Sequence, residues 1–174
     1  MTDSPTHLSL LADRLAAAHA RLEVVRGPAA LSRLLADCAR PPLVFQDHPW
    51  LREVISLLPP EAPAPLVLAT PPPNPHWHDG IDTAVTVAVG AVPETGSLLL
   101  DGFDPLAWQA SLRPRLHIIL VPTAHSALSL EEALTWTAQE PSGLVSWVTG
   151  PSRTADIEKV LVLGAQGAAA ILAI

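Results

Sequence analysis

Apolar residues at two different spacings divide the chain into alternating helices and strands. Leucine, alanine and valine recur every three or four positions over residues 8–22, 31–38 and 51–58, which is the period of an amphipathic helix. Other short runs are almost continuously apolar and predict buried strands at 43–45, 66–69, 82–89, 98–100, 117–121, 144–148 and 169–174. Ser129 and Glu132 have the spacing of a capping box and predict a helix that ends near Gln139.

This alternation predicts the α/β class. Strands without polar alternation are buried on both faces, so we expect a mostly parallel central sheet flanked by helices on both faces. A length of 174 residues suits one domain with a substantial core. We therefore expect a single domain over 1–174, with a helical N-terminal third to about residue 60 and a core at 82–174.

Composition narrows the class of protein. No apolar run is long enough for a membrane span, and the first fifteen residues do not resemble a secretion signal, so we expect a cytoplasmic protein. A net charge of −7 without basic clusters argues against a nucleic-acid partner. The one cysteine, Cys38, excludes an internal disulfide and any thiolate iron–sulfur or structural zinc site within this sequence. Its helical phase predicts a buried small apolar residue rather than a reactive thiol.

The segment 149–161 is the first candidate site. Gly150 and the following proline end the strand 144–148, and the apolar spacing over 157–161 predicts a helix that starts near Asp156. Ser152, Arg153, Thr154 and Asp156 would then surround free N–H groups at a helix start and form a cradle for a phosphate or a carboxylate. The alternative is that a polar residue merely caps the helix while Arg153 lies in water.

A second candidate is the glycine turn between two apolar strands. Glu94, Thr95 and Gly96 place a carboxylate and a hydroxyl where a ligand entering from the strand ends would meet them. Glu94 would act as a nucleophile or general base if burial raised its pKa. A turn carboxylate that only binds nearby N–H groups would have the same sequence, so both interpretations stay open.

Two histidine-containing segments and one glycine-rich turn are less informative about a functional site. The segment 76–79 offers alternating imidazoles, but no second ligand cluster accompanies it, and we predict no metal site and no cofactor. His117 is interpreted as a strand-end residue whose ring finds a backbone partner rather than as a catalytic base. Gly164, Gln166 and Gly167 form a flexible turn that either closes over the same pocket as Ser152 or simply begins with a helix C-cap.

Several of these segments together resemble a known family. Residues 150–158 (GPSRTADIE), 164–167 (GAQG), 94–96 (ETG) and 114–117 (PRLH) are similar to the LUD domain, most closely to the LutC (YkgG-like) lactate-utilisation proteins. The resemblance covers 82–174 in order and spacing. One motif departs from it, because the family usually has Gly-x-His-Gly-Pro where this chain has Gln166 and Ala168.

The resemblance implies a fold similar to the NagB/RpiA/CoA-transferase group. It also implies a non-redox component of a system that oxidises L-lactate to pyruvate beside iron–sulfur partners of the LutA and LutB type, with a small anionic ligand. In that picture Ser152, Arg153, Thr154 and Asp156 line a pocket together with the turn at 94–96. The alternative is a free-standing enzyme of the CoA-transferase or sugar-phosphate-isomerase type that uses Glu94, by analogy with the glutamate nucleophile of related CoA transferases.

Overall fold

The structure is a computed structural model, and it describes residues 5–62, 64–68, 80–102, 104, 109, 112–139, 144–151, 153–156, 160–163 and 167–174. The helices are α1 (Pro5–Ala17), α2 (Pro28–Cys38), α3 (Pro49–Ser56), the short 3-10 helix η1 (Thr123–His125) and α5 (Leu130–Gln139). The strands are β1 (Arg21–Leu22), β2 (Leu43–Gln46), β3 (Leu66–Leu68), β4 (Thr83–Val87), β5 (Gly90–Val92), β6 (Ser97–Asp101), β7 (Leu116–Leu120), β8 (Val145–Val148), β9 (Arg153–Asp156), β10 (Val160–Leu163) and β11 (Ala170–Ala173).

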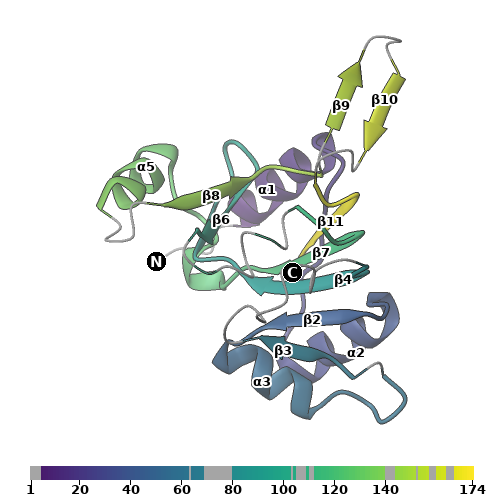
Figure 1. The fold of residues 1–174 in the computed structure, drawn as a ribbon. Coiled ribbons are helices and arrows are strands. Elements are labelled where there is room, and N and C mark those ends of the chain that lie inside the picture. The colour runs from purple at the N-terminus through teal and green to yellow at the C-terminus, as the bar shows by residue number, and fades with distance from the viewer. Residues whose placement is uncertain are drawn as a thin grey trace.

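A parallel sheet is the centre of the molecule (Figure 1). Among the described residues it has six strands in the order β1-β11-β7-β4-β2-β3, and every neighbouring pair runs parallel. The strands of this sheet come from both halves of the chain, because β2 pairs with β4 and β1 pairs with β11. The expected α/β class with a mostly parallel sheet is confirmed.

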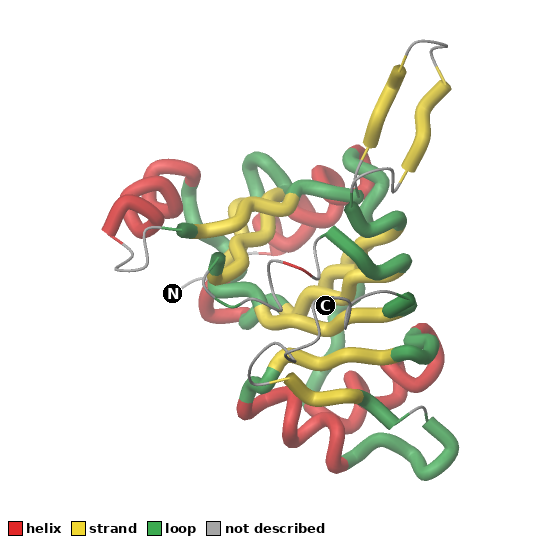
Figure 2. Tube along the Cα trace, in the orientation of Figure 1, coloured by secondary structure: helices red, strands yellow, loops and turns green. Residues whose placement is uncertain are grey.

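Each face of the sheet has its own core, and this explains why its strands are continuously apolar. Along β7, Ile118 and Leu120 pack with apolar residues of α2 and α3, whereas Ile119 packs with Leu11 and Leu15 of α1. Successive side chains of a strand point to opposite faces, so both faces must be covered. Helices α2 and α3 cover one face, and α1 contributes to the cover of the other (Figure 2).

The cover of that second face includes a small antiparallel sheet. Strand β6 pairs with β5 and with β8, and Leu98 and Leu100 of β6 join the same core as α1. On its other side this sheet packs against α5, where Leu99 lies in a cluster with Ala133 and Trp136. The capping box predicted for α5 is present, since the Ser129 N–H donates to Glu132 Oε2 (2.8 Å) and the Glu132 N–H donates to Ser129 Oγ (3.1 Å).

The predicted helix after Asp156 is wrong. Residues 153–156 and 160–163 instead form the antiparallel pair β9 and β10, with Val160 opposite Asp156 (Figure 1). The spacing of apolar residues over 157–161 fits one helical turn, but a short apolar run fits a strand equally well. The run Val160 to Leu163 is continuously apolar with β-branched residues, which favours the strand.

The first helix is shorter than its apolar pattern. Helix α1 ends at Ala17, His19 adopts a left-handed φ of 64°, and the Ala20 N–H donates to the Leu15 carbonyl. This turn directs Arg21 and Leu22 into β1 beside β11. Leu22 fits the helical spacing of apolar residues although it lies in β1, because its side chain packs against the core there.

Candidate functional site at the carboxyl edge of the sheet

The strand order contains a point where the chain leaves neighbouring strands in opposite directions. From β2 the chain passes through α3 to β3 at one edge of the sheet, whereas after β4 the next strand of the sheet is β7 on the other side. The two paths therefore diverge between β2 and β4. In open parallel sheets, the crevice outside the carboxyl ends of such strands is where ligands bind.

A cavity of about 1020 Å³ lies at this edge. Its lining comes from the ends of β2, β4, β6 and β7 and from α3, η1 and α5: Gln46, His48, Pro49, Trp50, Val87, Ala88, Val89, Asp101, Pro122, Ala124, His125, Leu128, Glu132 and Trp136. Apolar walls with a few imidazole, carboxylate and amide groups are the usual composition of a small-molecule site.

Gln46 builds the floor between β2 and β4. Its side chain is buried, its Oε1 accepts the N–H of Val87 (2.7 Å), and its Nε2 donates to Asp104 Oδ2 (2.5 Å). The Val87 N–H lies beyond the last pair of the register, Phe45 with Val85, so the amide extends the connection between the strands by one bond. The cavity therefore has a rigid base.

His48 presents a hydrogen-bond donor. It is the N-cap of α3, and its Nδ1 accepts the N–H of Trp50 (3.3 Å). An imidazole nitrogen that accepts carries no proton, so the neutral ring has its proton on Nε2. Burial lowers the pKa of His48, which favours that neutral ring. The imidazole meets the Trp50 indole edge to face, with centroids 5.7 Å apart and planes at 82°.

His125 has the opposite arrangement. Its Nδ1 lies 3.1 Å from the Val89 carbonyl oxygen, which only accepts, so Nδ1 carries the proton and donates. In the neutral ring Nε2 of His125 is then an acceptor. The cavity is thus lined by two imidazoles of opposite tautomer, one whose Nε2 is a hydrogen-bond donor and one whose Nε2 is an acceptor.

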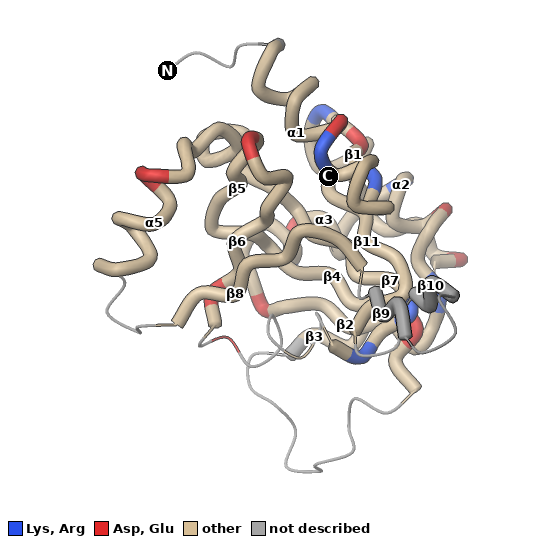
Figure 3. Tube along the Cα trace, turned by 90° about the horizontal axis from the view of Figure 1, so that it is seen from above, with Lys and Arg blue, Asp and Glu red and all other residues tan. Residues whose placement is uncertain are grey.

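The charged groups of the described lining are acidic. Glu132 accepts hydrogen bonds from Ser129, the backbone N–H first, and these lower the pKa of its carboxyl and keep it ionised. Asp101 supplies a second carboxylate, and the described lining contains no Lys or Arg. Figure 3 shows the same bias on α5, which carries red and no blue. The acidic residues of its first turn are Glu131 and Glu132, and the helix contains no Lys or Arg.

Glu94 lies outside this cavity. Its side chain is exposed on the β5–β6 turn, and its Oε2 accepts the N–H of Leu130 (3.3 Å) at the first turn of α5. This is the structural interpretation given above for a turn carboxylate, which binds an N–H group at a helix start. The shallow surface around Glu94 is formed mainly by residues 129–135 of α5 and its cap.

The neighbouring predicted residues Thr95, Gly96 and Gly150 hold the turn and the end of β8 together. Thr95 Oγ1 donates to Ser97 Oγ (2.8 Å), which in turn lies 2.9 Å from Thr149 Oγ1. Gly96 packs closely on α1, and Gly150 on the residue that follows this helix. A Cβ on Gly96 would lie 2.7 Å from Arg14 Cβ, and one on Gly150 would lie 2.6 Å from the Ala18 carbonyl oxygen. Glycine is therefore required here for close packing.

The remaining predicted residues do not gather around Glu94. Arg153, Thr154 and Asp156 belong to β9, so the helix start that was to form an anion cradle is absent at these positions. Ser152, Gly164 and Gln166 lie outside the described residues. Gly167 lines a hollow at the opposite, amino-terminal edge of the sheet.

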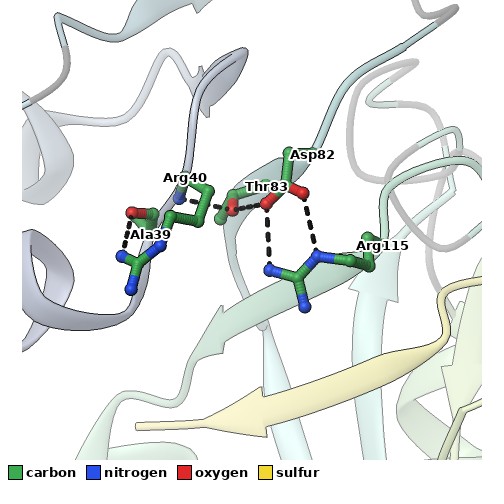
Figure 4. Close-up of polar contacts among 5 residues, drawn as sticks. All are labelled: Ala39, Arg40, Asp82, Thr83 and Arg115. Carbon is green, nitrogen blue, oxygen red and sulfur yellow. Dashed lines mark hydrogen bonds and ion pairs between the residues drawn. The ribbon is translucent and has the colours of Figure 1, made fainter.

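That amino-terminal edge is held by an ion pair from the PRLH segment (Figure 4). Arg115 binds Asp82 with both Nε (2.8 Å) and Nη2 (3.0 Å), and Thr83 Oγ1 donates to Asp82 Oδ1 (3.0 Å). Thr83 Oγ1 also accepts the N–H of Arg40 (3.0 Å). The hydrogen bond from Arg115, more than any other contact, lowers the pKa of Asp82. Arg115 thus joins the starts of β4 and β7.

His117 differs from its prediction as a strand-end residue with a backbone partner. It is the second residue of β7, fully buried, and its Nε2 lies 2.8 Å from Thr86 Oγ1 of β4. Nδ1 has no hydrogen-bond partner among the described residues. Desolvation lowers the pKa of His117 to about 3, so the ring is neutral and polar within the core.

Two further predictions concern metals and membranes. The histidines at 76 and 78 lie outside the described residues. In the part of the chain that is described, no three His, Cys, Asp or Glu side chains converge as metal ligands. Within the same residues, no helix is both long and apolar enough to cross a bilayer. Cys38 is only partly buried, but it packs on the core of α2 and α3, and desolvation raises the pKa of its thiol.

Sequence reasoning missed the residues of the carboxyl-edge cavity. A usable signal was present, because Gln46 to His48 directly follows the apolar run at 43–45, and His125 follows the run at 117–121 within a few residues. Carboxyl ends of parallel strands meet at one edge, so polar residues just after two such runs are expected to be neighbours. The cavity residues from α5, Glu132 and Trp136, carried no such signal.

Comparison with known proteins supports the resemblance noted in the sequence. Residues 79–174, more than half of the chain, match the LUD domain. A crystal structure of a DUF162 family protein from Deinococcus radiodurans is similar, with a TM-score of 0.68 and 19% sequence identity over 97% of this chain and 95% of that one. At that identity the likeness shows the fold. No curated protein matches the chain.

Proposed function

The chain belongs to the LUD domain family, which associates it with lactate utilisation, and from this premise we propose that it is a LutC-like, non-redox component of a cytoplasmic system that oxidises L-lactate to pyruvate. A single cysteine leaves this chain without the ligands of an iron–sulfur cluster, so electrons would pass through partner proteins of the LutA and LutB type. We further propose that 1–174 acts as one domain. The pairing of β2 with β4 and of β1 with β11 supports this proposal.

We place the small anionic ligand of this component in the carboxyl-edge cavity. The observation that carries this proposal is the pair of imidazoles with opposite tautomers, His48 and His125. An α-hydroxy acid has a carboxylate that accepts and a hydroxyl that donates. His48 Nε2–H would donate to the carboxylate, and His125 Nε2 would accept from the hydroxyl.

The alternative of a CoA-transferase-like or sugar-phosphate-isomerase-like enzyme has less support. Its proposed nucleophile, Glu94, is exposed and bonded to the start of α5. Phosphate esters are usually held by basic side chains. The described lining of the cavity has no Lys or Arg, and its carboxylates at Asp101 and Glu132 repel a doubly charged phosphate ester more strongly than the singly charged carboxylate of an α-hydroxy acid.

Calorimetric titration with L-lactate tests the ligand site. We expect the wild-type protein to bind, and we expect His125→Phe to weaken binding by about twofold to tenfold, because the hydrogen bond that the exposed His125 accepts from the ligand hydroxyl is lost. The exposed His7 of α1 gives the matched control His7→Phe, which keeps wild-type affinity. If Arg153→Ala abolishes binding of L-lactate while His125→Phe binds it normally, the ligand site lies in the segment 150–156 and the site proposed here is wrong.

The role beside redox partners needs a cellular test. A tagged copy purified from the native host grown on L-lactate is expected to bring down cysteine-rich iron–sulfur proteins, identified by mass spectrometry and visible absorption. Deletion of the gene should slow growth on L-lactate and leave growth on glucose unchanged, with rescue by the wild-type gene. Normal growth of the deletion strain on L-lactate would contradict the proposal.

A further inference from the structure

A second cavity adjoins the carboxyl-edge cavity and has a different lining. It measures about 350 Å³ and lies beyond the ends of β1, β7 and β11. Its walls are mostly aliphatic side chains of α1, the segment after β1, α2, α3, β7 and the residue after β11: Leu8, Leu11, Leu22, Val24, Val25, Leu31, Val54, Leu120, Val121 and Ile174. We call it the apolar cavity.

Of the four polar side chains in the described lining of the apolar cavity, Glu23 and Ser126 are engaged within the protein, and the other two are Glu53 and Thr123. Glu23 binds Arg21 (2.7 Å), and Ser126 Oγ donates to the Thr123 carbonyl (2.9 Å). Val24 and Trp50, by contrast, leave 67% and 50% of their surfaces exposed. Exposed apolar surface beside a concave apolar wall indicates a binding site for a hydrocarbon group.

The two cavities share a wall. Trp50 lines both of them, and the segment after β7 divides between them, with His125 on the carboxyl-edge side and Thr123 and Ser126 on the apolar side. His48, the proposed donor to the ligand, lies edge to face against Trp50. A ligand held by His48 therefore lies beside the residue that borders the apolar cavity.

We propose that the apolar cavity takes the aliphatic chain of the ligand whose polar head lies in the carboxyl-edge cavity, so that the protein binds α-hydroxy acids with a longer hydrocarbon chain than lactate. The assignment of the head group rests on the proposed function, whereas the assignment of the chain rests on the lining of the apolar cavity. A volume of about 350 Å³ falls in the size range of small-molecule pockets and leaves room for one alkyl chain.

Two titration series test the proposal by calorimetry. The first uses n-butanol, n-hexanol and n-octanol, which have a chain and no carboxylate. The second uses L-lactate, α-hydroxyhexanoate and α-hydroxyoctanoate. Each added methylene should raise the affinity about threefold to fourfold in both series until the cavity is full. Equal affinities along the alcohol series would overturn the proposal.

Substitutions inside the apolar cavity should remove the dependence on chain length. Val25→Phe fills the cavity, and Val24→Asp places a carboxylate at an exposed position of its wall, where folding tolerates the change. Val67 on the edge strand β3 lies outside both cavities, and Val67→Phe and Val67→Asp provide matched controls that keep the wild-type dependence. Retention of the full dependence in both cavity variants would also overturn the proposal.

The outcomes separate this inference from the proposed function. Alcohol binding that rises with chain length, without any binding of L-lactate, supports the apolar cavity and contradicts the proposed head group. Binding of L-lactate without a rise along either series supports the proposed ligand site and overturns the inference. If Val25→Phe releases a partner protein while alcohols show no length dependence, the cavity takes a partner side chain, and the inference is wrong.

Discussion

The side chain of Gln46 accepts the backbone N–H of Val87 at 2.7 Å and so joins β2 to β4 at the point where the chain leaves these strands in opposite directions. Both residues are buried, at 9% and 7% of their full exposure. The carboxyl-edge cavity therefore has a base fixed by a side chain rather than by the backbone ladder alone. Any ligand bound above it meets a pre-formed surface.

Removal of this amide should destabilise the fold. Gln46→Met keeps the length of the side chain and leaves the Val87 N–H without its acceptor, so we expect the free energy of unfolding to fall by roughly 1–3 kcal/mol. Denaturation by urea measures this change in the free energy of unfolding. Gln139→Met, at the exposed end of α5, makes the same chemical change and should alter stability by less than about 0.5 kcal/mol. Equal effects of the two substitutions would refute the role of Gln46.

His117 should make the protein less stable in mild acid. Its pKa is about 3 in the folded chain and near 6.5 when unfolded, so between these values the unfolded state binds the extra proton. Its contribution is present above pH 6.5 and is lost as the pH falls toward 3, by about 1.4 kcal/mol for each pH unit.

The slope of stability against pH isolates this contribution. Unfolding by urea at several pH values between about 7 and 4 should give a shallower slope for His117→Gln than for the wild type, whatever the loss of packing does to absolute stability. His7→Gln, on the exposed face of α1, should keep the wild-type slope. An unchanged slope in His117→Gln would show that the ring does not titrate in this way.

Two glycines with similar backbones separate conformational strain from close packing. Gly96 and Gly80 have φ values of 69° and 82°, but a Cβ on Gly96 would strike Arg14, whereas one on Gly80 would meet nothing within 4 Å. We expect Gly80→Ala to cost about 1 kcal/mol for the left-handed backbone. Gly96→Ala should cost roughly 1–3 kcal/mol more, because α1 must shift. Thermal and urea unfolding measure the loss of stability in both variants. Equal losses would contradict the close approach of Gly96 to Arg14.

Glu94→Gln distinguishes the two functional classes. The amide oxygen can still accept the Leu130 N–H, so we expect a loss of less than about 1 kcal/mol in stability, from the weaker interaction with the helix start. L-lactate affinity and growth on L-lactate should stay at wild-type levels, measured by calorimetry and by complementation of the deletion strain. A large loss of either would favour Glu94 as a chemical group and the enzyme alternative.

The fold was largely predictable because a strand that is buried on both faces has a mostly apolar sequence. The strands β2, β4, β7 and β11 are buried on both faces, and their largely apolar sequences are the pattern that such burial predicts. The buried polar exceptions are bonded within the sheet, as His117 is to Thr86. The β9–β10 hairpin was not predictable in the same way. Its strands are only four residues each, and at that length the helical and extended spacings of apolar residues coincide.

The site was harder to predict because its residues meet only through the sheet order. His48 and His125 are far apart in the sequence and come to line one cavity because β2, β4 and β7 are adjacent. Glu94 and Gly96 attracted attention as a compact motif, but the structure uses the motif to seat the β5–β6 turn on α1 and α5. A local motif reports close packing as readily as chemistry.

The place of β11 between β1 and β7 also constrains when the protein can fold. Among the described residues, 21–22 pair with 172–173, so the sheet cannot be completed until residues 170–173 have left the ribosome. Such non-local pairing slows folding and leaves apolar strand edges open in the meantime. A nascent chain of this protein is therefore expected to depend on chaperones that shield those edges during synthesis.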